Sequence, residues 1–321
     1  MKVAVLGAGA IGAYVGAALA RGGSDVHLIA RGPHLAAMRR DGVRIVDADG
    51  SWVERPACTD DPREIGPVDV VFLGLKAHAY ASAGPLLAPL LGADTAVVAA
   101  QNGVPWWYFH RHGGRFDGRR IEALDPEGAV TRAIPLDRVI GSVVYPATEI
   151  EAPGVIRHVE GRRIAIGEPD RSVSPRCEAI RDALVAGGLK CPIDPDLRAQ
   201  IWLKLMGNAA FNPLSALTGA TMRQIAEDPG AYALAGRIMR EVEAVAAALG
   251  AAPRVDVGRR LAGAAAVGDH KTSMLQDREA GRPLELDALA GAVLELAALV
   301  GVDAPALAAV TAALGLLMHF V

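Results

Sequence analysis

Residues 3–30 of the chain read VAVLGAGAIGAYVGAALARGGSDVHLIA, and this stretch decides the fold of the N-terminal half. The apolar run Val3–Leu6 is typical of a buried strand, and the alanine-rich segment that ends at Arg21 is typical of a helix. A second apolar run, Val26–Ala30, predicts another strand. A strand, a helix and a strand in this order predict the first βαβ unit of a parallel sheet.

The turn between the first strand and the helix carries the spacing GxGxxG. Gly7 permits a tight turn, Gly9 lets the backbone approach a pyrophosphate, and Gly12 lets the helix and the strand pack closely. The N-terminus of the helix presents free N–H groups to an anion. A purely structural glycine turn is the alternative, but the strand-to-helix context favours dinucleotide binding. The predicted pyrophosphate-binding residues are Gly7, Ala8, Gly9, Ala10, Ile11 and Gly12.

The residue that follows the second strand indicates which dinucleotide is bound. Sites that prefer NAD usually have Asp or Glu here, whose carboxylate accepts a hydrogen bond from the ribose 2′-OH. In this chain the strand ends in Ala30 and Arg31. An arginine suits the 2′-phosphate of NADP, so we predict NADP(H) as the cofactor and Arg31 as a binding residue. The alternative is that Arg31 is only a solvated strand end.

Further strands predict that the N-terminal domain is a complete doubly wound sheet. The chain has 321 residues, which favours two domains of roughly 100 to 200 residues each. Val68–Leu75 and Thr95–Ala100 are apolar runs of the kind found in parallel sheets that are covered on both faces. The short β-rich segments of Val139–Glu168 predict an antiparallel extension of the sheet. A helix over Ser174–Ala186 and a closing strand over Leu189–Ile193 complete the domain.

A second domain is predicted to begin at the turn residues that follow this strand. We place the boundary after Pro195, so residues 1–195 form a Rossmann-type NADP-binding domain with its antiparallel extension, and residues 196–321 form the substrate and catalytic domain. The predicted fold is α/β, a doubly wound sheet followed by an all-helical domain. The apolar helices suit a homodimer as well as an ordinary core. They are predicted at Leu197–Phe211, Tyr232–Leu249, Val255–Val267, Leu284–Val300 and Ala304–His319.

Charge and cysteine content exclude several classes of function. The chain has 33 Lys and Arg against 36 Asp and Glu, a net charge of −3, without a long run of either sign, so neither a nucleic acid nor a membrane partner is expected. Cys58, Cys177 and Cys191 lack CxxC spacing, which argues against a disulfide framework and a zinc site. The N-terminus lacks the features of a signal peptide, and Ala306–Val321 is shorter than the ~20 residues of a membrane span. We expect a cytoplasmic protein without a metal.

Polar residues in both domains mark a candidate active site. Lys76 follows the apolar run VVFLGL and Asn102 follows TAVVAAQ, so both lie past the carboxyl ends of strands, where ligands bind in open α/β sheets. In the apolar helix IWLKLMGNAAFNPL, Lys204, Asn208 and Asn212 are spaced by four, which puts them on nearly one face. Buried asparagine needs hydrogen-bond partners, so this stripe favours a ligand site over packing. A solvated helix face is the alternative.

A third polar cluster lies in the segment HKTSMLQDREAGRPLELDAL. Ser273 and Gln276 flank a Met-Leu pair, and Glu285 stands where the next helix begins. The helix dipole favours a carboxylate there, so Glu285 taken alone has an ordinary structural explanation.

Taken in order, these motifs resemble those of the ketopantoate reductases (2-dehydropantoate 2-reductases). GAGAIG, Arg31, the LK at Lys76, the QNG at Asn102, WLKLMGNAAFNPL, SMLQD and GRPLELD follow one another as in that family, over essentially the whole chain. The resemblance implies a Rossmann domain followed by a helical domain like the C-terminal domain of 6-phosphogluconate dehydrogenase. It also implies NADPH-dependent reduction of ketopantoate to pantoate, for pantothenate and coenzyme A synthesis.

The resemblance further implies roles for the polar residues. Lys204 is the general acid, and Glu285 holds the substrate hydroxyl and helps to orient the site. An ammonium suits a 2-oxo acid, because it stabilises and protonates the ketone oxygen as hydride arrives at the carbon. Lys76 and Asn102 serve the cofactor and the substrate together. The implied substrate contacts are Asn102, Asn208, Asn212 and Ser273.

Departures from the family pattern leave the substrate open. LEL at Leu284–Leu286 replaces the expected TEI, and the segment 105–130 is longer than a compact member needs and contains four consecutive aromatic residues, Trp106–Phe109. These rings either line the substrate cleft or pack the insertion onto its own domain. A paralogous reductase of another 2-oxo acid is therefore one alternative function. A non-catalytic NADP sensor is another.

Overall fold

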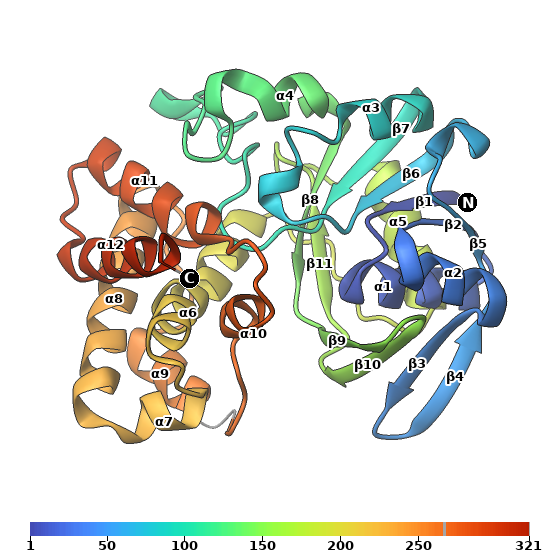
Figure 1. Ribbon diagram of the computed structural model, residues 1–321. Helices are drawn as coiled ribbons and strands as arrows, with labels where there is room; N and C mark the ends of the chain where they lie inside the picture. The colour runs from blue at the N-terminus through green and yellow to red at the C-terminus, as the bar shows by residue number, and fades with distance from the viewer. Residues whose placement is uncertain (266–267, 321) are drawn as a thin grey trace. The chain divides into compact units, whose positions relative to one another are not determined.

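The computed structural model describes residues 1–265 and 268–320, and the chain forms two compact units (Figure 1). Both units are discontinuous in sequence, because two short stretches between residues 102 and 127 belong to the second unit. The first unit contains Met1–Gln101, Trp107–Arg120 and Gly128–Leu197. The second contains Asn102–Trp106, Ile121–Glu127 and the described part of Arg198–Val321.

A seven-stranded sheet forms the centre of the first unit, in the order β11-β8-β7-β6-β1-β2-β5. Neighbouring strands are parallel except β11, which is antiparallel to β8. β1 lies between β2 and β6, so the chain first builds toward one edge of the sheet and later crosses to the other, and ligands bind at such a switch point. The strands are β1 (Lys2–Leu6), β2 (Asp25–Ile29), β5 (Ala57–Thr59), β6 (Val68–Leu73), β7 (Leu91–Ala99), β8 (Val139–Val144) and β11 (Ile164–Gly167).

The predicted βαβ unit is confirmed, with α1 (Ala10–Arg21) between β1 and β2. Val3, Val5 and Leu28 are fully buried, as the apolar runs predict. Gly16 lets α1 approach β2, because a Cβ there would overlap Leu28. The other helices of this unit are α2 (Gly32–Asp41), α3 (Gly84–Leu87), α4 (Ala129–Ala133) and α5 (Pro175–Ala186).

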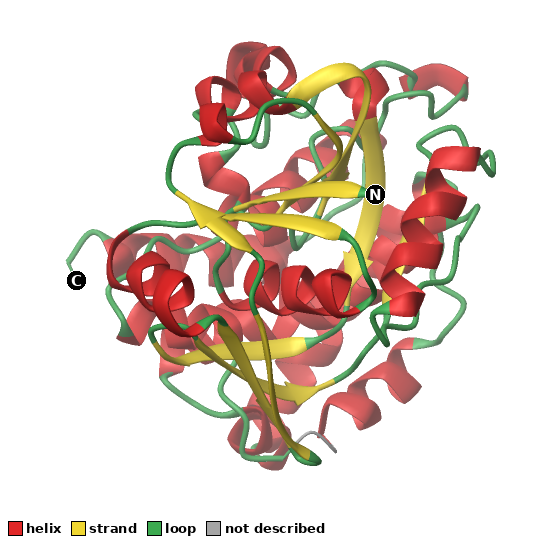
Figure 2. Cartoon of the chain, turned by 90° about the vertical axis from the view of Figure 1, so that its right-hand side faces the viewer, coloured by secondary structure: helices red, strands yellow, loops and turns green. Residues whose placement is uncertain are grey.

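The predicted antiparallel extension is only partly correct. β8 and β11 do extend the large sheet, but β9 (Ala147–Ala152) and β10 (Val155–Glu160) leave it and form a second, four-stranded sheet with β3 (Val43–Asp47) and β4 (Gly50–Glu54). Figure 2, in which strands are yellow, shows two separate groups of strands. β10 pairs with β3 in parallel, and this small sheet packs on α1, where Tyr14 stacks on His158 with ring centroids 4.6 Å apart. Burying the apolar side of α1 therefore decides where β9 and β10 pair.

The predicted closing strand over Leu189–Ile193 is wrong, since the described residues of this segment make only two isolated bridges, from Lys190 to Arg163 beside β11 and from Ile193 to Ile166 in β11. The N–H of Ile164 donates to Lys190 O and the N–H of Ile166 to Pro192 O. A continuous parallel ladder would need a bond back from residue 192 to Ile164, and proline has no N–H to make it.

From Arg198 onward the second unit is built of helices, as predicted. The helix predicted over Leu197–Phe211 continues to Thr218, with Pro213 inside it. The helix predicted over Val255–Val267 is described to Ala265, and its residues 266–267 lie outside the described residues. A π-helical turn over Asp287–Gly291 precedes α11. The helices are α6 (Leu197–Thr218), α7 (Met222–Glu227), α8 (Pro229–Ala248), α9 (Val257–Ala265), α10 (Ser273–Glu279), α11 (Ala292–Val300) and α12 (Pro305–Met318).

The aromatic insertion is a packed part of the structure. All four rings of Trp106–Phe109 are buried, with at most 4% of each residue exposed. Trp107 lies against β8, because a Cβ on Gly141 would overlap its ring. Phe109 makes an edge contact with His112, at 5.3 Å between centroids. These contacts support the packing alternative over a lining of aromatic rings for the substrate.

Two properties of the described residues bear on the expected partners. Across residues 1–265 and 268–320, none of the helices combines the length and the apolar character needed to cross a bilayer. The same residues bring together no group of three His, Cys, Asp or Glu side chains suited to hold a metal ion.

Candidate active site

The loop after β1 has the shape that its glycines predict. Gly7 adopts φ +94°, a conformation that glycine adopts readily, and the N–H groups of Gly7 and Ala8 both donate to Ile29 O at the end of β2. A Cβ on Gly12 would overlap Gly7 O, so only glycine lets α1 pack this closely. A Cβ on Gly9 would meet no atom within 4 Å. The start of α1 is therefore open for a ligand, beside N–H groups that helix termini offer to anions.

The loop after β6 lies directly against the loop after β1. The N–H of Gly74 donates to Leu6 O at 2.9 Å, and a Cβ on Gly74 would overlap Gly7 O. The sequence analysis did not single out Gly74 as a residue of this site. Its position directly after the apolar run VVFL could have indicated a close approach of two loops. Lys76 follows two residues later, before the short helix Ala77–Ala79, and so lies past the carboxyl end of β6 as predicted.

Arg31 and His34 lie at the end of β2. Arg31 is exposed and precedes the first turn of α2. His34 accepts a hydrogen bond from the N–H of Gly154 on Nδ1 at 3.0 Å. Burial lowers the pKa of His34, and an interaction with the backbone of Ala8 opposes this shift. His34, which the sequence analysis missed, therefore stays close to the loop after β1 as a neutral ring at neutral pH.

In the second unit, Lys204 on α6 is joined to Asn102. Lys204 Nζ donates to Asn102 Oδ1 at 2.6 Å, across 102 positions of sequence. Asn102 is held in place by its neighbours: Gly103 has φ +84°, and the N–H of Val104 donates to Ala288 O at 2.9 Å. A Cβ on Gly103 would overlap Ala288 O, so glycine is required where this loop meets the π-helical turn. The docking of the loop at Gly103 and Val104 thus places Asn102 as the hydrogen-bond acceptor of Lys204.

The charge of Lys204 is tuned by its surroundings. Burial lowers the pKa of Lys204 to about 8; the carboxylate of Glu285 opposes this shift, and the guanidinium of Arg260 adds to it. An amine with this pKa is largely protonated at neutral pH and still gives up its proton readily, as a general acid must. The structure therefore brings Lys204, Asn102 and Glu285 together.

Arg260 on α9 is a second cation of this site that the sequence analysis missed. Its guanidinium lies against Gly207, one turn of α6 beyond Lys204, where a Cβ would be 2.8 Å from Nη2 and 3.3 Å from Cζ. The signal in the sequence was weak, because a glycine inside a helix has several explanations.

The remaining predicted residues take different positions in the second unit. Asn208 is half-buried on α6 one turn after Lys204, and Asn212 is 6% exposed. Ser273 begins α10 and is exposed. Thr272 caps that helix, since its Oγ1 accepts from the N–H of Leu275 at 3.2 Å.

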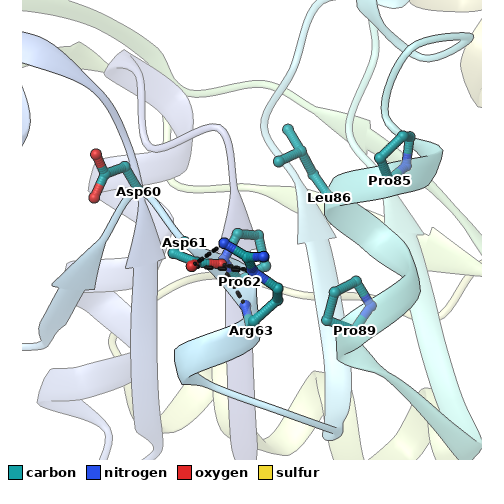
Figure 3. Close-up of a pocket in the computed structure, with 7 residues that line it drawn as sticks. All are labelled: Asp60, Asp61, Pro62, Arg63, Pro85, Leu86 and Pro89. Carbon is teal, nitrogen blue, oxygen red and sulfur yellow. Dashed lines mark hydrogen bonds and ion pairs between the residues drawn. The ribbon is translucent and has the colours of Figure 1, made fainter.

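A hollow of about 540 Å³ opens elsewhere in the first unit (Figure 3). Asp61 and Arg63 form an ion pair of 2.7 Å on one side of it, opposite Pro85 and Leu86. These charges are already satisfied by one another, and the residues that line the hollow include none of the predicted site residues. We assign it no role in the site.

Comparisons with known proteins cover almost the whole chain. The sequence model of the family described as "Ketopantoate reductase PanE/ApbA" matches residues 3–171, and that of "Ketopantoate reductase PanE/ApbA C terminal" matches residues 196–317. The chain is 49% identical to a 2-dehydropantoate 2-reductase of Mesorhizobium japonicum, over 97% of this chain and 96% of the relative.

Solved structures resemble the chain over the same extent. The 2-dehydropantoate 2-reductase of Geobacter metallireducens has a TM-score of 0.86 at 30% identity and covers 98% of this chain and 99% of its own. A D-mandelate dehydrogenase solved with NADH and anilino(oxo)acetate has a TM-score of 0.82 at 21% identity, over 98% and 97% of the two chains. At that identity the likeness concerns the fold.

Proposed function

The chain belongs to the ketopantoate reductase family, and on this premise we propose that it reduces ketopantoate (2-dehydropantoate) to pantoate with NADPH. It is an oxidoreductase that acts on a CH–OH group. The observation that supports the proposal most directly is the ammonium of half-buried Lys204, 2.6 Å from Asn102 Oδ1 and influenced by the charge of Glu285. In this proposal the product serves pantothenate and coenzyme A synthesis.

We place NADP(H) on the loop after β1. The residues fit a dinucleotide, because a Cβ at Gly9 would meet open space where a pyrophosphate would approach the start of α1. When bound, NADPH supplies the hydride. Arg31 would pair with the 2′-phosphate, and Lys76 adds a cation past the end of β6. The proposed binding residues are Gly7, Ala8, Gly9, Ala10, Ile11, Gly12, Arg31, Lys76 and Asn102.

Lys204 donates the proton that completes the reduction. Its Nζ proton moves to the ketone oxygen as that oxygen gains negative charge, and the neutral amine then regains a proton from water. Asn102 orients the ammonium by accepting one of its hydrogens. Glu285 raises the proton affinity of Lys204 and in our proposal also holds the substrate hydroxyl. The proposed substrate contacts are Asn102, Asn208, Asn212 and Ser273.

We expect the reduction rate to fall as pH rises through about 8. The reaction needs Lys204 protonated, and its pKa is lowered to about 8, so kcat/KM should be constant below this value and decline about tenfold per pH unit above it. A pH–rate profile with NADPH measures the break. Glu285→Gln removes the charge that raises the pKa of Lys204 and should move the break to lower pH. A profile without a break near pH 8 would contradict the acid role.

Replacement of Arg31 tests the choice of cofactor. We expect Arg31→Gln to lower kcat/KM for NADPH roughly 10- to 100-fold, because it removes a charged hydrogen bond to the 2′-phosphate, and to leave the value for NADH nearly unchanged. Arg40→Gln, at an exposed arginine of the same helix that pairs with Asp41, is the matched control. Equal turnover of NADH and NADPH by the unmodified protein would refute the NADP preference.

A panel of 2-oxo acids tests the function itself. NADPH absorbance would follow turnover of ketopantoate beside several branched 2-oxo acids. Highest kcat/KM for ketopantoate supports the proposal, and better turnover of another acid makes the protein a paralogous reductase instead. Binding of NADPH without turnover of any acid would favour a sensor.

A further inference from the structure

Gly207 stands in the middle of α6, where a glycine is unfavourable. Glycine in a helix interior costs about 1 kcal/mol relative to alanine, and this residue is buried. The space that its missing side chain leaves is taken by Arg260, since a Cβ there would be 2.8 Å from Nη2 and 3.3 Å from Nε and Cζ. The glycine therefore admits a guanidinium to the turn of α6 that links Lys204 to Asn208.

The positive charge of Arg260 also lowers the pKa of Lys204, the proposed proton donor. This charge and the carboxylate of Glu285 both influence Lys204, in opposite directions, so each lies close enough to shift the pKa of Lys204. Arg260 and protonated Lys204 are both cationic, so the field of both would favour a negatively charged ligand beside them.

The proposed substrate carries such an anion next to the reacting carbon. In a 2-oxo acid the carboxylate is bonded directly to the ketone carbon, so a ketone oxygen that takes the proton of Lys204 brings the carboxylate into the immediate surroundings of Lys204. An arginine fork matches the two oxygens of a carboxylate, whereas a lysine is a point charge better suited to a single oxygen.

We infer that Arg260 binds the carboxylate of the substrate while Lys204 serves the ketone oxygen, and that Gly207 makes room for this guanidinium. The inference rests on the proposed function, because it takes the substrate to be a 2-oxo acid. It makes Arg260 a determinant of specificity for acids over uncharged 2-oxo compounds.

The test compares a 2-oxo acid with its uncharged amide. The acid is the best substrate of the panel, and kcat and KM are measured for both compounds with Arg260→Gln, Arg260→Lys and Arg259→Gln. We expect Arg260→Gln to lower kcat/KM for the acid roughly 10- to 100-fold, mainly through KM, and to leave the amide nearly unchanged. Arg260→Lys should recover part of the loss. Arg259→Gln, at the exposed neighbour on α9, should change neither.

Two further measurements separate binding from a structural role. Loss of the Arg260 charge should move the alkaline break of the pH profile upward, because this charge lowers the pKa of Lys204. Gly207→Ala keeps every charge but presses a methyl group on the guanidinium, and should raise KM for the acid more than for the amide. This variant also serves if Arg260→Gln does not fold, as judged by its melting temperature.

The outcomes distinguish this inference from the proposed function. Equal losses for the acid and the amide in Arg260→Gln, or no loss for either, overturn the role of Arg260 and leave the reductase proposal intact. Failure of the unmodified protein to reduce any 2-oxo acid overturns both.

Discussion

Lys204→Ala is expected to lower kcat by roughly 10² to 10⁴, the range that a positioned acid contributes, with NADPH affinity nearly unchanged. The variant loses the half-buried ammonium that donates to Asn102 Oδ1, while the loop with Gly7, Gly9 and Gly12 belongs to the other unit and is not altered. Single-turnover reduction measures the chemical step, and a fluorescence titration measures NADPH binding.

The control is Lys190→Ala, at an exposed lysine of the first unit, which should leave kcat within experimental error. The residual activity of Lys204→Ala should also lose its decline above pH 8, because the titrating group is gone. A kcat close to that of the unmodified protein, with the pH break retained, would remove Lys204 from the acid role.

The second large effect is expected from a pair of substitutions in the glycine loop after β1. Gly12→Ala places a methyl group on Gly7 O and should lower the free energy of unfolding by about 1 to 3 kcal/mol. Gly9→Ala places its methyl group in open space and should change that free energy by less than about 0.5 kcal/mol. The methyl of Gly9→Ala nevertheless occupies the approach of a pyrophosphate, so the Kd for NADPH should rise roughly 10- to 100-fold.

Denaturant unfolding and NADPH titration of both variants separate these effects. The expected pattern is loss of stability in Gly12→Ala and loss of affinity alone in Gly9→Ala. Unchanged NADPH affinity in Gly9→Ala would show that this loop does not bind the cofactor as proposed. A matching loss of stability in both would show that Gly9 has a packing role instead.

Local patterns were enough to predict most strands of the large sheet, although the edge strand β5 was not predicted. The βαβ unit follows from apolar runs and from glycines a few residues apart, and the longer helices of the second unit follow from the periodicity within each segment. The short helices α7 and α10 were not predicted. The small sheet was not predictable in this way. β10 pairs with β3 across more than a hundred positions of sequence. The alternation of apolar and polar residues within one segment does not determine which distant strand pairs with it.

The candidate site likewise has one part that the sequence predicted and one part that depends on tertiary packing. The spacing of four predicted that Lys204, Asn208 and Asn212 share one helix, and α6 carries all three. The hydrogen bond from Lys204 to Asn102 depends on a loop that docks through Gly103 and Val104 on Ala288. Arg259 and Arg260 are indistinguishable as neighbours in sequence, and only packing against Gly207 separates them.

Residue order alone therefore predicted the glycine loop after β1, the class of fold and the polar stripe of α6, because backbone sterics and helical spacing act over a few residues. The tertiary structure decided the partner of Lys204, the pKa near 8 and the place of Arg260. Those properties arise from desolvation and from charges at close range. Both depend on which distant segments pack together, and a single stretch of sequence does not contain that information.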